Sequence, residues 1–234
     1  MIVEISVSIK LKDSIFIGGG SGTSGMGVDS ATISRSDGCL IIPGSSFKGK
    51  LRSECERIAR AFEEEVCLPP IPDNMCPHYF LKSKKETYYC VICKIFGSPW
   101  LRGSLNFSDL IWKVPYNHFS PEEWKKVRKT DIRPGVSISR YTKVKMEREL
   151  FFKEVMYTGM DASFNGKITG NLGTNKELAL LIAGLRTLLS IGGMKSRGLG
   201  RLEDTFKYER YQVISPKYDD SNFIEELNEW QKKG

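Results

Sequence analysis

Apolar and polar residues alternate at the start of the chain. The positions between the apolar ones are charged or carry a hydroxyl group, and the apolar positions themselves are Val3, Ile5, Val7, Ile9 and Leu11. A period of two is typical of a strand that buries one face. We therefore expect a half-buried strand over residues 3–11, followed by a glycine-rich turn over residues 18–27.

Two longer segments place apolar residues three or four positions apart, which is the spacing of an amphipathic helix. The first spans residues 45–66, and its apolar stripe is Phe47, Leu51, Cys55, Ile58 and Phe62. The second begins at a capping box formed by Thr174 and Glu177, whose side chains satisfy free backbone N–H groups. Its expected core face is Leu178, Leu181, Ile182, Leu185, Leu188 and Leu189.

Shorter elements are expected between and after these helices. A strand is predicted around residues 105–109, a hairpin over residues 130–160 and a strand over residues 202–206. A second capping box at residues 120–123 and apolar spacing over residues 222–231 predict two further helices.

The pattern as a whole predicts an α+β protein. Helices alternate with short strands, as in proteins whose helices pack on one face of an antiparallel sheet. No internal repeat or low-complexity linker interrupts the chain, so we expect a single domain over residues 1–234. The content of 40% hydrophobic and 27% charged residues is ordinary for a globular protein of 234 residues.

Charge and the N-terminus narrow the class of protein. A formal net charge of +7 favours a polyanionic partner such as nucleic acid, although charge alone is a weak indication. The N-terminus lacks the basic segment and apolar run of a signal peptide. The longest apolar runs are too short to cross a bilayer. We therefore expect a cytoplasmic protein without a membrane partner, whose cysteines are thiols or metal ligands.

The first basic cluster lies at the start of the first predicted helix. Its hydroxyl and basic residues are Ser45, Ser46, Lys48, Lys50 and Arg52. Cations in the first turns oppose the positive end of the helix dipole, which is unfavourable unless an anion lies between them. A phosphate would be such an anion. The alternative is an ordinary solvated helix start, and the spacing does not match the phosphate-binding loop of an ATPase.

A second basic cluster lies within a glycine-rich loop near the C-terminus. Four glycines within residues 192–200 allow close approach of the backbone to a ligand. The polar residues of this loop are Lys195, Ser196, Arg197 and Arg201. Two such clusters favour a groove for a nucleic-acid strand over a mononucleotide pocket. The prediction requires Lys48 and Arg197 to lie on the same side of the molecule.

The predicted hairpin is also basic. Arg133 and Arg140 stand among alternating basic, apolar and aromatic residues. Such a segment can follow a phosphate backbone while its apolar side chains contact bases. The alternative is an exposed hairpin with solvated basic side chains.

Cysteines between the first helix and the hairpin have the spacing of a metal site. Cys76 and His78 form one short pair, and Cys90 and Cys93 form the other. Two short-spaced pairs are typical of structural zinc, and Cys67 is an alternative to His78 as the fourth ligand. The other interpretation is buried thiols that bind nothing. A redox pair is disfavoured because a β-type segment is expected after Cys93.

Candidate catalytic groups are few. The chain has two histidines, of which His78 belongs to the cysteine cluster and His118 is expected at the surface. A serine or cysteine triad therefore has no evident base. Asp29 ends the glycine-rich turn, where a carboxylate could help to position a divalent cation. Spacing alone favours the alternative, a turn-forming aspartate.

Four segments together resemble the RAMP superfamily, which builds the crRNA-binding backbone of CRISPR effector complexes. They are residues 42–52, 90–98, 135–140 and 192–200. The greatest similarity is to the repeating backbone subunit of type III (Csm/Cmr-like) effectors.

The resemblance implies an RRM-like (ferredoxin-like) palm, a zinc-bearing insertion over residues 67–96 and a β-hairpin thumb over residues 130–160. It adds Ser137 to the residues expected to bind RNA. Copies of the chain would stack along the crRNA together with other subunits of the complex. The thumb would pass through the duplex of guide and target RNA at regular intervals.

The resemblance also gives Asp29 a role that spacing does not. Asp29 matches a loop aspartate that cuts target RNA with Mg²⁺ or Mn²⁺, where the neighbouring 2′-hydroxyl attacks the phosphate and the protein mainly orients the RNA. Ala31 stands where the family often has a proline, and Phe16 where it often has a histidine. The resemblance leaves two alternatives: a non-catalytic RNA-binding subunit, and a metal-free endonuclease that processes precursor crRNA.

Overall fold

The structure is a computed structural model, and the sections below concern the residues that it describes. These are residues 1–19, 29–36, 39–84, 88–113, 130–156, 163–203 and 211–215. Several predictions fall outside them, namely the capping box at 120–123, the helix over 222–231, and most of the glycine-rich turn and of the strand over 202–206.

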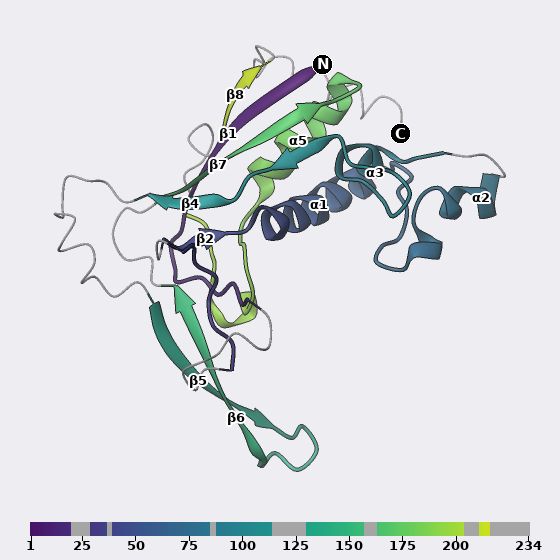
Figure 1. Cartoon of the computed structure of the whole chain (residues 1–234). Coiled ribbons are helices and arrows are strands. Elements are labelled where there is room, and N and C mark those ends of the chain that lie inside the picture. Colours follow the sequence, from purple (N-terminus) through teal and green to yellow (C-terminus); the bar gives the residue numbers. More distant parts are fainter. Residues whose placement is uncertain are drawn as a thin grey trace.

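An interior strand of the main sheet is β1 (Ile2–Lys10), as the alternating pattern predicts. The alternate apolar side chains from Val3 to Ile9 are buried, whereas those between them are partly exposed. It pairs antiparallel with β7 (Ser163–Asn171) on one side and with β8 (Tyr211–Ser215) on the other. Non-local pairing therefore joins the two ends of the chain in one sheet (Figure 1).

The other edge of the sheet is built by shorter strands. Both β3 (Leu105–Phe107) and β4 (Leu110–Lys113) pair antiparallel with β7, and β2 (Ile41–Ile42) pairs with β4. The resulting order is β2-β4-β7-β1-β8, with β3 pairing with β7 beside β4.

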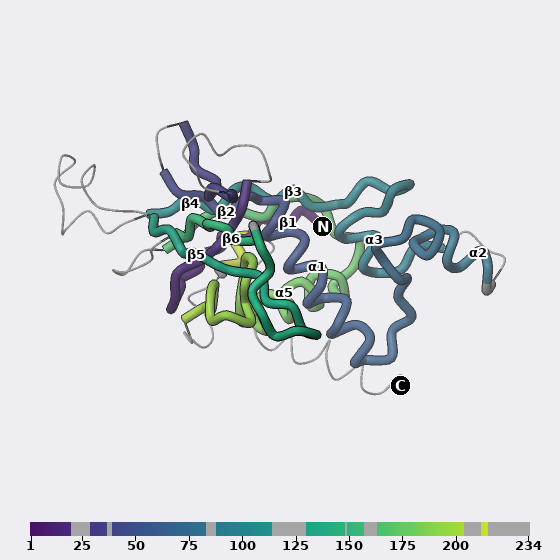
Figure 2. Tube along the Cα trace, turned by 90° about the horizontal axis from the view of Figure 1, so that it is seen from below, coloured from purple at the N-terminus to yellow at the C-terminus, as the bar shows by residue number. Residues whose placement is uncertain are grey.

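Two long helices pack together on the buried face of this sheet (Figures 1 and 2). They are α1 (Gly44–Ala61) and α5 (Asn175–Thr187). Their close contact depends on Gly184, because a Cβ there would lie 2.6 Å from the Cys55 sulfur and 3.0 Å from Leu51 Cδ1. The packing of two helices on one antiparallel sheet confirms the predicted α+β class.

The start of α5 follows the predicted capping box. The Thr174 hydroxyl accepts a hydrogen bond from the Glu177 N–H at 3.3 Å, and Glu177 Oε2 accepts one from the Gly173 N–H at 2.7 Å. The predicted core face is buried except at Leu189, which is 67% exposed. Leu188 caps the helix with extended backbone, so the helical period no longer applies at Leu189.

The first helix is shorter than predicted. Its stripe is correct, because Phe47, Leu51 and Cys55 are buried. However, α1 ends at Ala61, and Glu63 takes a left-handed conformation with φ 59°. The chain therefore leaves the helix before it reaches the cysteine-bearing segment.

The cysteine-bearing insertion contains three short helices that the sequence did not predict. They are η1 (Pro72–Asn74), α2 (His78–Lys84) and α3 (Val91–Phe96). Cys90 is the N-cap of α3. The expectation of a β-type segment after Cys93 was therefore wrong, because Cys93 lies inside a helix. Figure 1 shows α2 and α3 at the end of α1 that is remote from the hairpin.

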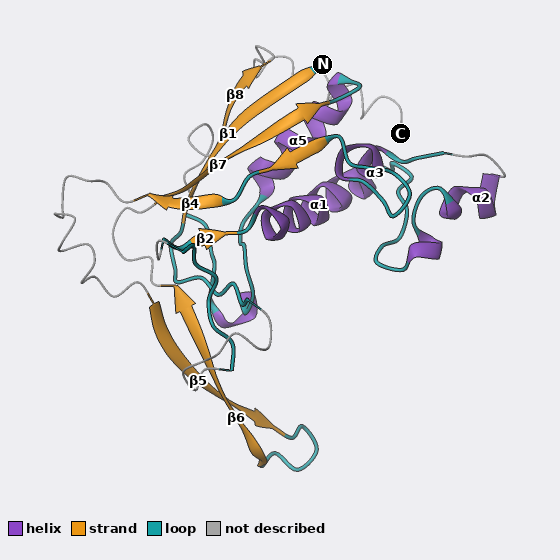
Figure 3. Cartoon of the chain, viewed as in Figure 1, coloured by secondary structure: helices purple, strands orange, loops and turns teal. Residues whose placement is uncertain are grey.

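The predicted hairpin is present and projects away from the main sheet (Figure 3). Strand β5 (Thr130–Ile138) pairs antiparallel with β6 (Lys145–Met156). Gly135 lies opposite Phe151, and a Cβ at Gly135 would lie 2.2 Å from the aromatic ring. Tyr141 at the tip is 96% exposed.

The buried apolar side chains of the palm and the insertion join in one hydrophobic cluster. It includes Val3 of the sheet, Phe47 of α1, and Phe80 and Ile95 of the insertion. In the described part of the chain, no helix combines the length and apolar character needed to cross a membrane.

Candidate nucleic-acid interface and metal centre

The first turn of α1 offers backbone N–H groups to an anion. The N–H of Gly44 donates to Asp109 Oδ1 at 2.8 Å, and the N–H of Phe47 donates to the Pro43 carbonyl at 3.0 Å. Among the described residues, none accepts the N–H groups of Ser45 and Ser46, and both residues are exposed. The first turn contains no acidic residue. This arrangement favours phosphate binding at the helix N-terminus.

Lys48 adds a positive charge beside these groups. It is half-buried, and its Nζ lies 5.8 Å from the centroid of the Phe107 ring. Burial, followed by the positive charge of Arg52, lowers the pKa of Lys48. An anion beside Lys48 would offset both effects.

Lys50 and Arg52 have partners within the protein. Lys50 Nζ lies 2.5 Å from Glu54 Oε1, and Arg52 Nε lies 2.8 Å from Glu56 Oε1. Arg52 Nη1 also donates to the Gly97 carbonyl at 2.8 Å. The expectation that Arg52 contacts RNA does not fit this geometry, because its guanidinium is turned toward the insertion.

The second basic cluster lies in residues 192–201, named here the glycine-basic loop, whose backbone few other sequences could adopt. Met194 and Gly198 are left-handed, with φ 56° and 79°. A Cβ at Gly200 would lie 1.9 Å from the Ile191 carbonyl oxygen. The short helix η3 (Lys195–Arg197) lies within the loop, and its three residues are exposed.

Arg201 differs from the other polar residues of this loop. Its Nε lies 2.6 Å from Asp13 Oδ2, although the side chain is 58% exposed. The ion pair therefore fixes the stem of the loop and leaves part of the guanidinium accessible to solvent.

The two basic segments lie on the same side of the palm. The contact of Gly184 with Leu51 and Cys55 places the C-terminal part of α5 against the middle of α1. The glycine-basic loop follows α5 directly, and Figure 1 shows both segments on the side from which the hairpin projects. That Lys48 and Arg197 face one continuous groove stays a prediction.

Asp29 lies at the base of the hairpin. Its N–H donates to the Phe152 carbonyl at 3.0 Å, and its Oδ2 accepts the Phe152 N–H at 2.6 Å. Ser30 continues this contact, because its carbonyl accepts the Glu154 N–H at 3.0 Å. The carboxylate is therefore held by a residue far away in the sequence, which a simple turn-forming aspartate would not require.

Sequence reasoning missed Lys153, which lies beside this contact. Its Nζ is 4.9 Å from the centroid of the Phe151 ring and 5.3 Å from that of Phe16, so both rings contact the cation. The Phe16 carbonyl accepts the Gly193 N–H at 2.8 Å. Phe16 thus connects the hairpin base with the glycine-basic loop. The alternation of Phe151 and Lys153 was visible in the sequence, but the approach of Phe16 was not.

A second cation lies opposite Lys153. Arg133 of β5 is the cross-strand partner of Lys153 in β6 and is exposed. Side chains directly opposite one another in a hairpin lie on the same face, and like charges there destabilise the pair. Farther along β5, Ser137 is half-buried, and Arg140 in the connecting turn is exposed.

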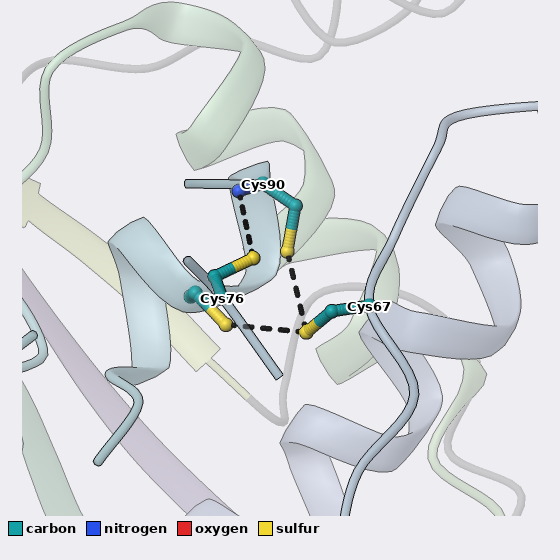
Figure 4. Close-up of side chains that lie close together, drawn as sticks. Cys67, Cys76 and Cys90 are labelled. Atoms are coloured by element: carbon teal, nitrogen blue, oxygen red, sulfur yellow. Dashed lines mark hydrogen bonds between the residues drawn. The ribbon is translucent and has the colours of Figure 1, made fainter. Parts of the chain in front are cut away.

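Four cysteines of the insertion converge on one point (Figure 4). The sulfur atoms of Cys67, Cys76, Cys90 and Cys93 all lie within 4.8 Å of one another, and the four residues are buried. Cys67 Sγ is 3.4 Å from Cys93 Sγ and 3.8 Å from Cys90 Sγ. The Cys90 N–H donates to Cys76 Sγ at 3.4 Å.

His78 is not part of this group. Its ring packs edge-on against Trp100 at 4.2 Å between centroids. The ligand set that includes His78 is therefore wrong for this structure, and the alternative ligand Cys67 takes its place. Cys67 replaces His78 because the segment that follows α1 brings the Cys67 sulfur next to the other three sulfurs.

The sulfur set fits a tetrahedral metal. Zinc–sulfur bonds of about 2.3 Å place the sulfurs of a tetrahedron about 3.8 Å apart. Hydrogen bonds from Cys67 and Cys93 lower the pKa of Cys90, whereas burial raises the pKa of Cys76 to about 12. Four thiolates this close together repel one another when no cation lies between them. A divalent cation such as zinc would stabilise four thiolates together.

Two comparisons relate this chain to known proteins. The model of the RAMP superfamily matches residues 8–203, which include all the sequence-predicted site residues. The CRISPR system Cms endoribonuclease Csm3 of Methanocaldococcus jannaschii is 27% identical over 239 residues. The alignment covers 96% of this chain and 90% of that protein. The resemblance inferred from the sequence is confirmed.

Proposed function

This chain belongs to the RAMP superfamily, and from that premise we propose that it is a backbone subunit of a type III CRISPR effector complex. It binds crRNA and cleaves complementary target RNA at regular intervals with Mg²⁺ or Mn²⁺. Its partners are the two RNAs, further copies of itself and other subunits of the complex. The full-length similarity to an endoribonuclease of such a system supports this proposal.

The proposed architecture is one RAMP domain with two additions. The order strand–helix–strand–strand–helix–strand, with sheet order β4-β7-β1-β8, supports an RRM-like (ferredoxin-like) palm. The insertion over residues 67–96 holds structural zinc on four cysteines. The hairpin within residues 130–160 is the thumb.

In this proposal the crRNA follows the two basic segments of the palm. The start of α1 supplies the exposed Ser45 and Ser46 and the half-buried Lys48, and the glycine-basic loop supplies Lys195 and Arg197. Backbone N–H groups and cations together recognise phosphates without reading sequence. We therefore expect binding to depend on the length of the RNA and on salt more than on its bases.

The position of Asp29 carries the proposal of cleavage. Its carboxylate lies at the hairpin base, where it accepts a hydrogen bond from β6. The same hairpin carries Arg133 on β5 directly opposite Lys153 on β6. A target-RNA phosphate would relieve the repulsion between these cations. Asp29 would help to hold a divalent cation at that phosphate, and attack by the neighbouring 2′-hydroxyl then depends mainly on how the RNA is oriented.

The test is cleavage of target RNA by the assembled complex. Wild type with guide RNA, complementary RNA and Mg²⁺ is expected to give evenly spaced products. Asp29→Asn retains an oxygen acceptor for the Phe152 N–H but loses the charge, so we expect cleavage to fall at least about 100-fold while binding persists. Asp73→Ala removes an exposed aspartate of the insertion and serves as the control. Full cleavage by Asp29→Asn would contradict the proposal.

One observation favours a second candidate, an RNA-binding subunit without cleavage. Phe16 carries no group that could accept a proton, and it lies at the hairpin base. Stable binding of both RNAs by wild type, without cleavage in Mg²⁺ or Mn²⁺, would establish this alternative. A crRNA-processing endonuclease has less support, because the His78 ring packs against Trp100.

A further inference from the structure

The side chain of Arg52 is held by three separate groups. Nε donates to Glu56 Oε1 at 2.8 Å, Nη1 to the Gly97 carbonyl at 2.8 Å and Nη2 to Cys93 Sγ at 3.7 Å. Only 18% of the side chain is exposed. The guanidinium therefore joins α1, the end of α3 and one sulfur of the cysteine centre.

A second arginine of α1 makes a contact of the same kind. Arg60 Nη2 donates to the Cys67 carbonyl at 3.2 Å. Arg52, Glu56 and Arg60 are four residues apart and thus lie on one face of α1. This face contacts the backbone or the sulfur of two of the four cysteines, Cys67 and Cys93.

The charge of a loaded centre explains why an arginine is suited to this position. Four thiolates around a divalent cation carry a net charge of −2 in a buried place, which is costly without a compensating charge. A guanidinium stays charged at all relevant pH values and has several donors in fixed directions. It can therefore donate to a thiolate, a carbonyl and a carboxylate simultaneously.

We propose that Arg52 is a positioning residue of the four-cysteine centre, where it compensates the thiolate charge at Cys93 and fixes the metal-bearing insertion to α1. This inference rests on the proposed zinc site. It replaces the sequence-based expectation that Arg52 contacts RNA. It also connects metal binding with the helix whose first turn offers its N–H groups to phosphate.

The first test measures the affinity for zinc by competition with a chromophoric chelator. Groups that contact metal ligands typically contribute a factor of roughly 10–100 in metal affinity. We expect Arg52→Gln to lose about tenfold or more. Arg57→Gln is the matched control, because Arg57 lies on the same helix, pairs with Glu54 and is 66% exposed. Equal zinc affinities for Arg52→Gln and Arg57→Gln would overturn the proposal.

A spectroscopic measurement separates this role from simple support of the fold. With Co²⁺ in place of zinc, loss of a donor to Cys93 should shift the sulfur-to-cobalt absorption of fully loaded Arg52→Gln. Arg52→Lys keeps the positive charge but lacks the several N–H donors in fixed directions of a guanidinium. We therefore expect its zinc affinity to lie between those of wild type and Arg52→Gln. The Arg52→Lys variant still tests the proposal if Arg52→Gln does not fold. If Arg52→Gln does not fold while Arg52→Lys shows wild-type spectra and zinc affinity, then Arg52 only supports the fold, and the proposal is overturned.

A double substitution tests whether Glu56 alone accounts for Arg52. If Arg52 only neutralises Glu56, adding Glu56→Gln to Arg52→Gln should restore zinc affinity. If Arg52 acts on the thiolates, the double variant should bind zinc as weakly as Arg52→Gln. Restored affinity in the double variant would contradict the proposal.

RNA binding distinguishes failure of this inference from failure of the proposed function. Each phosphate contact contributes about 0.7 to the slope of log K against log salt for a single strand. With zinc saturating, Arg52→Gln should keep the wild-type slope, whereas Lys48→Gln should lower it. A lowered slope for Arg52→Gln would make it a phosphate ligand and overturn the inference. A wild type that binds zinc but no RNA would instead refute the proposed function alone.

Discussion

At the scale of single residues, two like charges lie opposite one another at the hairpin base, where they do not stabilise the protein in the absence of a ligand. Arg133 and Lys153 are directly opposite in the antiparallel pair, and Lys153 is further held by two phenylalanine rings. Neighbouring like charges are tolerated when a ligand of opposite charge lies between them. An anion beside Asp29 would relieve this repulsion.

This interpretation predicts opposite effects on stability and binding. Arg133→Gln should raise the free energy of unfolding of the free protein by about 0.5 kcal/mol, because it removes cross-strand repulsion. It should weaken target-RNA binding and lower its salt dependence. Urea unfolding and RNA titration at several salt concentrations measure the two effects. Arg102→Gln, at an exposed arginine on the insertion side, is the control. A variant that is both less stable and unimpaired in binding would contradict the prediction.

At the scale of elements, α5 determines where the glycine-basic loop begins. The Thr174 hydroxyl caps its N-terminus, and Gly184 allows it to approach α1 closely. Thr174→Ala should lower the free energy of unfolding by about 1 kcal/mol, because the Glu177 N–H loses its acceptor. Urea unfolding should show a lower midpoint with an unchanged slope. Thr174→Ser keeps the hydroxyl and should stay near wild type, and an equal loss in both variants would exclude the cap as the cause.

The elements that could be predicted are those whose signals are local. The alternation of β1 and the cap of α5 involve neighbours in sequence, and both are confirmed. Leu189 was misplaced because the end of α5 is set by its packing. The helices of the insertion were missed because they are too short to show a repeated apolar period, although Ile92, Ile95 and Phe96 of α3 are buried.

The candidate site divides in the same way. Asp29 and the two basic segments were predicted from composition and from the family resemblance, neither of which requires knowledge of contacts between distant residues. The replacement of His78 by Cys67, the orientation of Arg52 and the approach of Phe16 to Lys153 all depend on where distant segments meet. No periodicity in the sequence contains that information.

At the scale of the whole molecule, the cysteine centre and the hairpin lie at different ends of α1 (Figure 1). The palm between them is held by the sheet and by the packing of α1 on α5, neither of which involves the sulfurs. Removal of a structural metal should therefore loosen the insertion without unfolding the palm, since a buried sulfur set without its cation loses its main source of stability.

Hydrogen exchange of the full chain before and after zinc chelation tests this separation. We expect protection to fall in α3 and in the backbone around Cys67 and Cys76. The face of α1 that carries Arg52 and Arg60 should lose protection less, because α5 still covers its other face. Strands β1 and β7 should remain protected, since their ladder lies in the sheet. Uniform loss of protection would show that the metal supports the whole fold, and unchanged exchange in α3 would show that the sulfurs hold no structural metal.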